Sequence, residues 1–307
     1  MKRLSLICIL AMSLLYSFAQ DCLIALQPIV TPSTDGNYFP QVESYLTNRL
    51  RGLTTGSGGA SSLDNNQFAL AASYDVVDKQ IISGTPTKVV YNLSVSLFVV
   101  DLKTCKIYSS FEIELKGVGD NETKALINSF KPINRSNGSI KNFIADGTRK
   151  ILDYYDNNYQ KIIAKAKSDA AMKNFDAAIY TLMCVPECST GYNAVLEALP
   201  SIYQQFVDQH CNENLAQARS AWYASPNHDG ASVAGLYLSE IYPDAACYGD
   251  AQLLFQEIKK QMGEEWKFMM KQYNDAIEME RQRLDMMRDI AIAYANNQPK
   301  ETIKIFW

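Results

Sequence analysis

The sequence predicts an α+β fold: a small, mostly antiparallel sheet with helices on one face, followed by an α-helical repeat-like domain and a long C-terminal helix. Three observations predict it. Apolar and polar residues alternate between Pro86 and Gly117, as in paired strands with one buried face. Strand signals disappear after Tyr159, where apolar residues take helical spacing. A heptad seam then runs from Glu264 to Asn297, a stretch without Pro or Gly.

The amino terminus has the pattern of a secretory signal peptide, residues 1–19. Lys2 and Arg3 precede an apolar run from Leu4 to Phe18, and Ala19 completes a small-residue cleavage site. A membrane anchor is the alternative, but the run is short for a bilayer and no later stretch approaches its length. We therefore expect export with cleavage after Ala19, and no transmembrane segment after cleavage.

Composition and charge exclude a nucleic-acid partner. The chain has 307 residues, of which 47% are hydrophobic, so it is long enough for about two domains with cores of their own. Its net charge is −4, its pI is near 5.4, and its Lys and Arg residues are scattered. A basic surface for a phosphate backbone is therefore not expected.

The cysteines indicate a disulfide-bonded exported protein. Of the seven present, Cys8 is removed with the signal peptide, and the remaining six are an even number that favours disulfides in an oxidising compartment. Their spacing does not choose among the possible pairings. We expect Cys22 to pair with Cys105, Cys184 with Cys188, and Cys211 with Cys247.

The first domain, residues 20–160, is expected to begin with a strand and a helix. Leu23–Val30 is a short apolar stretch ended by Pro and Asp-Gly signals. Apolar residues then recur at helical spacing from Phe39 to Leu53. The stretch Thr54–Asn66 is rich in Gly, Ser and Asn and predicts a loop, which lacks the Gly-Lys-Thr or Gly-Lys-Ser ending of a phosphate-binding loop.

Three strands are expected next. Phe68–Val76 and Val89–Val99 carry an apolar residue at every second position, and a turn is expected near Asp101. A slip of one residue would bury charged side chains, so the register is expected to be firm. The last strand places Ile107, Phe111, Ile113 and Leu115 opposite Tyr108, Glu112, Glu114 and Lys116.

Two helical segments follow, and the whole order resembles a group of exported bacterial envelope domains. A short helix is expected within Gly117–Phe130 and a longer one from Ile140 to Tyr159. The opening strand, helix and Gly/Ser-rich loop, the phrase VVDLKTCKIYSSFEIELKGVG and the bend at Gly119 carry the resemblance, over about residues 21–160. The group comprises the TolB amino-terminal domain, the curli-secretion lipoprotein domain and the lipoprotein activators of penicillin-binding proteins.

That resemblance implies a non-catalytic module that binds other envelope proteins. It also implies a place in the periplasm or at the outer-membrane periphery of a bacterium. Cys22 follows Ala19, Gln20 and Asp21 rather than the Leu-small-small sequence that lipid attachment requires, so the chain departs from the curli-secretion pattern. A lipid anchor is therefore not expected.

The second domain, residues 161–263, is expected to consist of helical hairpins. The phrase Phe175-Asp176-Ala177-Ala178-Ile179 after a turn at Asn174 resembles the start of the second helix of a tetratricopeptide repeat, and only this phrase matches. An apolar helix end, a Pro, a Cys and a Tyr around Pro186 recur around Pro243, 57 residues later, which suggests a second copy. Stacked helical hairpins commonly present a groove to a partner segment.

The C-terminal region, residues 264–307, is expected to recognise a partner. Its heptad seam leaves an apolar stripe on a charged helix, which either packs on its own domain or pairs with a second copy; both remain open. After Pro299, the tail ETIKIFW alternates as a strand does, and is expected to dock in a groove or at a sheet edge. The partner-binding candidates are Trp266, Met270, Tyr273, Ile277, Leu284, Met287, Tyr294, Ile303, Ile305 and Trp307.

No catalytic or metal-binding motif is present, so no enzyme activity, cofactor or metal is expected. A zinc site would have to combine His210 with nearby cysteines whose spacing matches no standard finger. His210 is expected in a turn between helices and His228 in a surface loop. The expected function is an exported binding or assembly component of the cell envelope with a protein partner. The alternatives are a secretion-channel subunit, and a hydrolase that uses acidic residues such as Glu112 and Glu114.

Overall fold

The computed structural model describes residues 24–31, 39–56, 67–273 and 275–297. These residues form one four-stranded sheet and eight helices, which is the α+β fold that the sequence predicts. The expected signal peptide, Cys22 and the C-terminal tail with Ile303, Ile305 and Trp307 lie outside the described residues. Among the described helices, none has the length and apolar content that a membrane crossing needs.

The chain divides into two compact units. The first, which we call the sheet unit, comprises the described residues up to Tyr154 together with Pro186–Ser189. The second, the helical unit, comprises Tyr155–Val185 and the described residues from Thr190 on.

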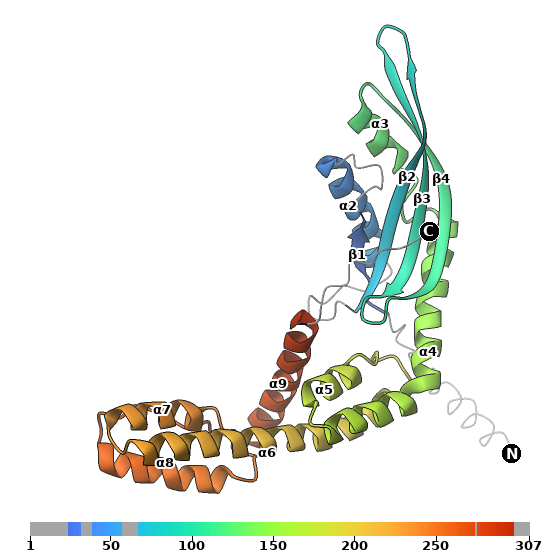
Figure 1. The fold of residues 1–307 in the computed structure, drawn as a ribbon. Helices are drawn as coiled ribbons and strands as arrows, with labels where there is room; N and C mark the ends of the chain where they lie inside the picture. Colours follow the sequence, from blue (N-terminus) through green and yellow to red (C-terminus); the bar gives the residue numbers. More distant parts are fainter. Residues whose placement is uncertain (1–23, 32–38, 57–66, 274, 298–307) are drawn as a thin grey trace, which may run out of the picture. The chain divides into compact units, whose positions relative to one another are not determined.

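The sheet has the strand order β1-β2-β3-β4 (Figure 1). Its strands are β1 (Gln27–Val30), β2 (Phe68–Ile82), β3 (Lys88–Asp101) and β4 (Lys106–Gly119). β1 runs parallel to β2, while β2 with β3 and β3 with β4 are antiparallel. The sheet is therefore mostly antiparallel, as expected.

The β3–β4 hairpin follows the predicted alternation and turn. The carboxylate of Asp101 accepts hydrogen bonds from the backbone N–H groups of Lys103 (2.8 Å) and Thr104 (3.2 Å), which closes the turn. The predicted apolar face of β3 is buried, each side chain being at most 8% exposed: Val89, Tyr91, Leu93, Val95, Leu97 and Val99.

β4 departs from the predicted alternation at its start. A β-bulge opposite Val99 and Val100 gives β4 one extra residue there, which reverses the alternation locally. Tyr108 is consequently buried, and its ring lies 6.0 Å from that of Tyr154. Ile107 is 46% exposed. The expected faces of Ile107 and Tyr108 were therefore wrong.

Three helices cover one face of the sheet: α2 (Pro40–Gly56), α3 (Glu122–Ser129) and the first half of α4 (Gly138–Ala171). The rings of Phe111 in β4 and Phe143 in α4 stack with centroids 5.7 Å apart. The buried side chains of α2 recur at steps of three and four, as predicted: Val42, Leu46, Leu50 and Leu53.

The close approach of α3 to β4 requires a glycine. A Cβ added to Gly117 would lie 2.1 Å from the carbonyl oxygen of Ala125 and 2.5 Å from the backbone nitrogen of Ser129. No side chain fits in that space. The glycine that the sequence places at the end of the strand therefore sets the distance between helix and sheet.

The opposite face of the sheet is polar over most of its area. Ser94 in β3 donates a hydrogen bond of 2.7 Å to Glu112 in β4, and both groups face water. Near Asp101 this face instead carries a small cluster of buried apolar residues, Ala69, Ala71, Phe98 and Val100, with Ile29 and Leu102 packed against it.

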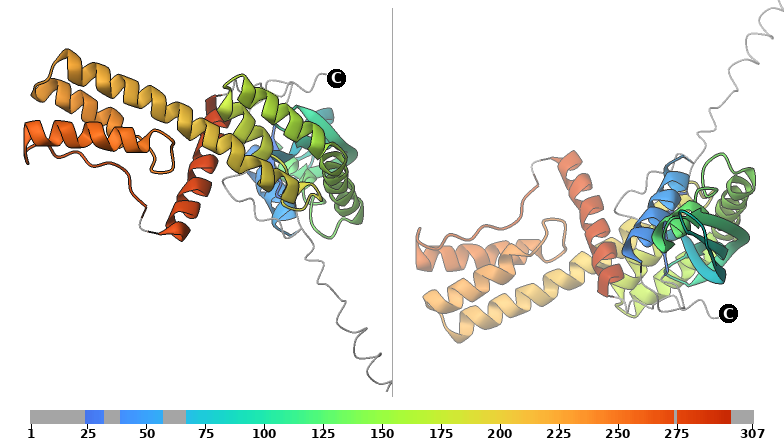
Figure 2. Two further views of the ribbon diagram at one scale, coloured as in Figure 1. Left: turned by 90° about the horizontal axis from the view of Figure 1, so that it is seen from below. Right: turned by 90° about the horizontal axis from the view of Figure 1, so that it is seen from above.

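The helical unit contains the second half of α4 and five further helices (Figure 2). The predicted turn before α5 is present: Lys173 adopts a positive φ of 64°, and Asn174 precedes the first residue of the helix. The long helix α6 lies beside α7 and α8. The bounds are α5 (Phe175–Met183), α6 (Tyr192–Ala224), α7 (His228–Ser239), α8 (Tyr248–Met262) and α9 (Ala276–Asn297).

The connections α5–α6 and α7–α8 have the same local structure. The backbone N–H of Thr190 donates to Asp156 of α4 at 2.8 Å, and the N–H of Ala246 donates to Asp208 of α6 at 2.7 Å. From residue 190 to residue 246 is 56 positions, so the offset is one less than the two prolines suggest. Buried residues recur at this offset: Leu182 and Leu238, Val185 and Ile241, Val195 and Ala251, Leu199 and Phe255, Ile202 and Ile258.

The predicted single helix from Glu264 to Asn297 is not formed. α8 ends at Met262 and is followed by Gly263, whose φ of +76° a residue with a side chain rarely adopts; the described residues between Gly263 and the start of α9 at Ala276 are non-helical. Trp266 explains the break, because its side chain is only 4% exposed and its indole nitrogen donates to the carbonyl oxygen of Ala231 at 2.9 Å. The segment that carries Trp266 is non-helical, and it places this side chain against α7. We call residues 264–273 the strap.

Candidate partner-binding groove

A groove of about 560 Å³ opens on the helical unit. Its walls come from the end of α4, the start of α5 and the middle of α6, and Tyr294 of α9 closes it. The turn at Lys173 and Asn174 places the start of α5 beside α6. Helix packing thus brings together residues that lie far apart in the sequence.

The floor of the groove is aromatic. The rings of Phe175 and Phe206 meet edge to face with centroids 6.3 Å apart. His210, one turn further along α6, stacks on Phe206 at 5.8 Å. Tyr294 lies near Tyr180 of α5, with ring centroids 5.1 Å apart. Such a surface can bury an apolar side chain of a ligand.

The rim carries charges of both signs. Lys165 and Asp169 form an ion pair of 2.6 Å along α4, and the Asp169 side chain is only 13% exposed. Lys173 is exposed at the mouth, and Asp176 and Glu213 are the other two carboxylates of the lining. The rim can therefore contact either charge of a ligand.

His210 lies within α6 and not in a turn between helices, so its expected place was wrong. Burial, and then the nearby charge of Lys271, lowers the pKa of His210 below its usual value. The side-chain amide nitrogen of Asn214 lies 2.9 Å from its Nδ1. Among the described residues, no group of three or more His, Cys, Asp or Glu side chains could hold a metal ion.

No protein-family model, curated protein or solved structure matches the chain.

The expected partner-binding residues of the C-terminal region take different positions. Trp266 and Met287 are each 4% exposed, so their side chains belong to the core of this chain. Ile277 is 82% and Leu284 48% exposed, seven residues apart on one side of α9. Met270 and Tyr273 are partly buried in the strap, and Tyr294 reaches the groove.

Asp244, in the α7–α8 connection, fastens the strap and α9 to that connection within the helical unit. Its carboxylate accepts a hydrogen bond of 2.9 Å from Nε of Arg283 in α9 and one of 3.2 Å from the hydroxyl of Tyr273 in the strap. The side chain of Asp244 is 6% exposed and that of Arg283 25%. Burial, and then the charge of Asp244, raises the pKa of Tyr273 to about 12. Of the two arrangements left open by the sequence, α9 packs on its own domain, against α5.

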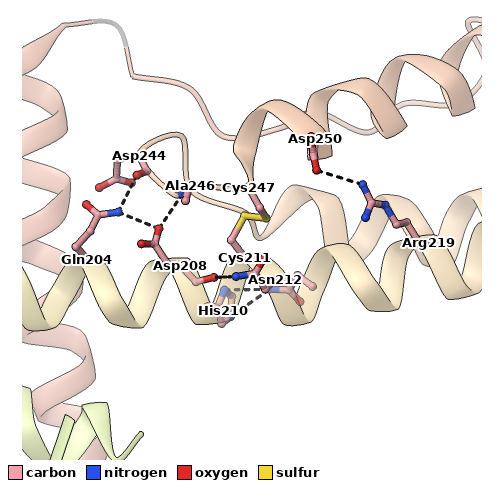
Figure 3. Close-up of a disulfide and its surroundings, with 11 residues drawn as sticks. Gln204, Asp208, His210, Cys211, Asn212, Arg219, Asp244, Ala246, Cys247 and Asp250 are labelled. Carbon is pink, nitrogen blue, oxygen red and sulfur yellow. Dashed lines mark hydrogen bonds and ion pairs between the residues drawn. A yellow bond between two sulfur atoms is a disulfide. The ribbon is translucent and has the colours of Figure 1, made fainter. Parts of the chain in front are cut away.

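A disulfide fastens the α7–α8 connection to α6 (Figure 3). Cys211 and Cys247 are bonded with Cα atoms 6.0 Å apart, which confirms the expected pair. Asp208, one turn before Cys211, accepts from the N–H of Ala246 and, at 3.0 Å, from the side-chain amide of Gln204.

The other two expected cysteine pairs are not formed. Cys188 is disulfide-bonded, but Cys184 is a buried thiol and not its partner. Cys105 is an exposed thiol at a positive φ of 54° in the β3–β4 turn, so it is not bonded to Cys22, which lies outside the described residues. The spacing of the cysteines in the sequence does not determine which of them form disulfides.

Sequence reasoning missed most of the groove. Phe206, Gln209, His210 and Glu213 lie at steps of three and four, which is typical of one face of a helix. That spacing could have found them. Their convergence on Phe175 depends on the path of α5, which the sequence does not reveal.

Proposed function

We propose that this chain is an exported, non-enzymatic binding or assembly component of the bacterial cell envelope. It recognises an extended segment of a partner protein through the groove of its helical unit and its C-terminal helix. The observation that carries the proposal is the groove itself, because its volume of about 560 Å³ is combined with an aromatic floor and a charged rim. Ligand sites generally have volumes of about 300–1,000 Å³.

The chemistry of the lining suits a peptide better than a small metabolite. Phe175 and Phe206 offer contact area for one apolar side chain, while the side-chain amides of Asn174 and Gln209 can each donate to and accept from a peptide backbone. Buried aromatic anchors surrounded by polar groups are typical of protein–protein recognition.

The sheet unit supports an envelope role by resemblance. Its described elements occur in the order strand, helix, three strands and two helices, as in the envelope domains that the sequence resembles. Those domains bind other envelope proteins, and the same kind of role is proposed here. The exposed pair Ile277 and Leu284 on α9 provides a second apolar contact for a partner or for another copy of the chain.

A selection of peptides tests the proposal. Random peptides displayed on phage are selected for binding to the purified chain, and the selected peptides are measured against two variants. Phe206→Glu places a charge on the aromatic floor. Leu253→Glu is the matched control, because Leu253 of α8 is 72% exposed and lies outside the groove.

The selected peptides are expected to lose at least about tenfold in affinity for Phe206→Glu, a loss of about 1.4 kcal/mol, and to bind Leu253→Glu normally. Circular dichroism confirms that both variants are folded. Peptides that bind both variants as well as the parent chain would place recognition elsewhere. Light scattering on the same samples examines the channel alternative, which requires a ring of subunits.

A further inference from the structure

The sheet unit contains a second hollow, of about 460 Å³, at some distance in sequence from the groove. It lies between α2 and the loop that joins α3 to α4. Asn48, Arg49 and Gly52 line it from α2, and Ile133, Asn134, Arg135 and Ser136 from the loop. α4 begins at Gly138, two residues after this lining ends.

Among the described residues, positive charge gathers at this hollow without a carboxylate to balance it. Arg49 donates to the carbonyl oxygen of Lys131 at 3.3 Å, and Arg135 to the hydroxyl oxygen of Thr55 at 2.9 Å and to the carbonyl oxygen of Gly52. Arg51, on the same helix, donates to the side-chain oxygen of Asn48. In the part of the chain that the structure describes, all these acceptors are neutral, whereas eleven ion pairs form elsewhere.

Arg49, which lines the hollow, also carries an unused hydrogen-bond donor. Nε of Arg49 is buried and has no acceptor among the described residues. The guanidinium group is held in place by its bond to the Lys131 carbonyl and by the ring of Tyr45, 5.1 Å away. A buried charged donor without an acceptor is costly, so an acceptor that reaches this side chain would relieve the cost.

The positive end of α4 adds to the same potential. The side-chain oxygen of Asn137 accepts from the N–H groups of Ser139 (3.1 Å) and Ile140 (3.3 Å), so the helix begins with a fixed geometry beside the hollow. A helix start carries partial positive charge. Arginine is suited to phosphate because its planar fork matches two oxygens of the group.

We propose that the hollow between α2 and the α3–α4 loop binds a phosphate group, held by Arg49 and Arg135. The proposal is independent of the function of the groove, because all its residues belong to the sheet unit. The phosphate can belong to a free ion or to the head group of a lipid. Both present the same oxygens to the two guanidinium groups.

Two titrations of the purified full chain distinguish these sources. Inorganic phosphate is titrated by isothermal calorimetry at low salt, where surface charge is least screened. Sedimentation with vesicles of phosphatidylglycerol in phosphatidylcholine examines the lipid head group. The variants are Arg49→Gln, Arg135→Ala and a control, Arg149→Ala, whose parent side chain forms ion pairs on the exposed side of α4.

Loss of one charged hydrogen bond corresponds to about 1.5–3 kcal/mol, so each of the first two variants is expected to bind about 10- to 150-fold more weakly, with the control unchanged. Arg135→Ala removes two bonds to α2 and can unfold it. Arg49→Gln is therefore the decisive variant, and thermal melting without phosphate confirms its fold. The proposal is overturned if the parent chain binds neither probe, or if Arg49→Gln binds as tightly as the parent.

Discussion

Removal of the Asp244 carboxylate is expected to release the C-terminal segment. Asp244 is almost fully buried and holds Arg283 of α9 and the hydroxyl of Tyr273 at once. A hydrogen bond to a charged group contributes about 1.5–3 kcal/mol, and loss of one partner of a fully buried ion pair costs about 3–5 kcal/mol. Because Arg283 is still a quarter exposed, we expect Asp244→Ala to destabilise α9 by about 2–3 kcal/mol.

Hydrogen exchange measures this effect directly. A loss of about 2–3 kcal/mol lowers the protection of the α9 amides about 30- to 150-fold, while the amides of β3 keep theirs. A double-mutant cycle with Arg283→Ala isolates the coupling between the two side chains. Glu240→Ala is the matched control, since Glu240 pairs with Lys271 but is 61% exposed, and it is expected to cost less than about 1 kcal/mol. Unchanged α9 protection in Asp244→Ala, or a coupling near zero, would refute the reasoning.

Three further predictions follow from the described contacts. The raised pKa of Tyr273 means that the folded state keeps this proton while the unfolded state loses it near pH 10, so stability falls between about pH 10 and 12. Tyr273→Phe is expected to flatten that part of the pH profile in urea titrations; an unchanged slope would contradict it. Loss of the disulfide between Cys211 and Cys247, whose bond spans 36 residues, in Cys211→Ser is expected to cost about 3–4 kcal/mol in the same assay, and an unchanged stability would contradict it. Gly117→Ala is expected to lower the melting temperature by several degrees, because its Cβ overlaps α3, whereas Gly138→Ala meets open space and should be neutral.

The sequence predicts the sheet well because alternation is a local property. The position of each apolar residue in β3 indicates which face of the sheet is buried, and the partner strand repeats the pattern. The bulge at Tyr108 was not predictable in the same way. One extra residue in a strand leaves the local content of apolar and polar residues unchanged. The side chain of Asp101 and the residues after it were sufficient to place the turn.

The C-terminal seam shows where periodicity fails. Trp266 and Met287 fit one heptad pattern, yet they reach the core from an extended segment and from a helix, respectively. The sequence spacing of buried residues therefore does not show whether each lies in a helix or in an extended segment. Gly263, with its positive φ, ends α8 just before the predicted helix, so it marks that boundary but gives no signal for the non-helical strap.

The groove depends on still longer-range information. Phe206 and Tyr294 lie 88 positions apart, and no local pattern connects them. The same holds for Arg49 and Arg135 in the sheet unit. Sites of this kind form where turns and helix ends bring separate segments together.

Trp266 and Met287 come later in the sequence than α5 and α7, which they help to cover. The order of synthesis therefore determines when the helical unit can finish folding. Trp266 is bonded to Ala231 of α7, and α9, which carries the buried Met287, packs against α5; both of these helices are synthesised earlier. A nascent chain therefore leaves these helices uncovered until residues 266 and 287 have been synthesised. Products of premature termination would keep that apolar area bare, and quality-control proteases would have a means of recognising them.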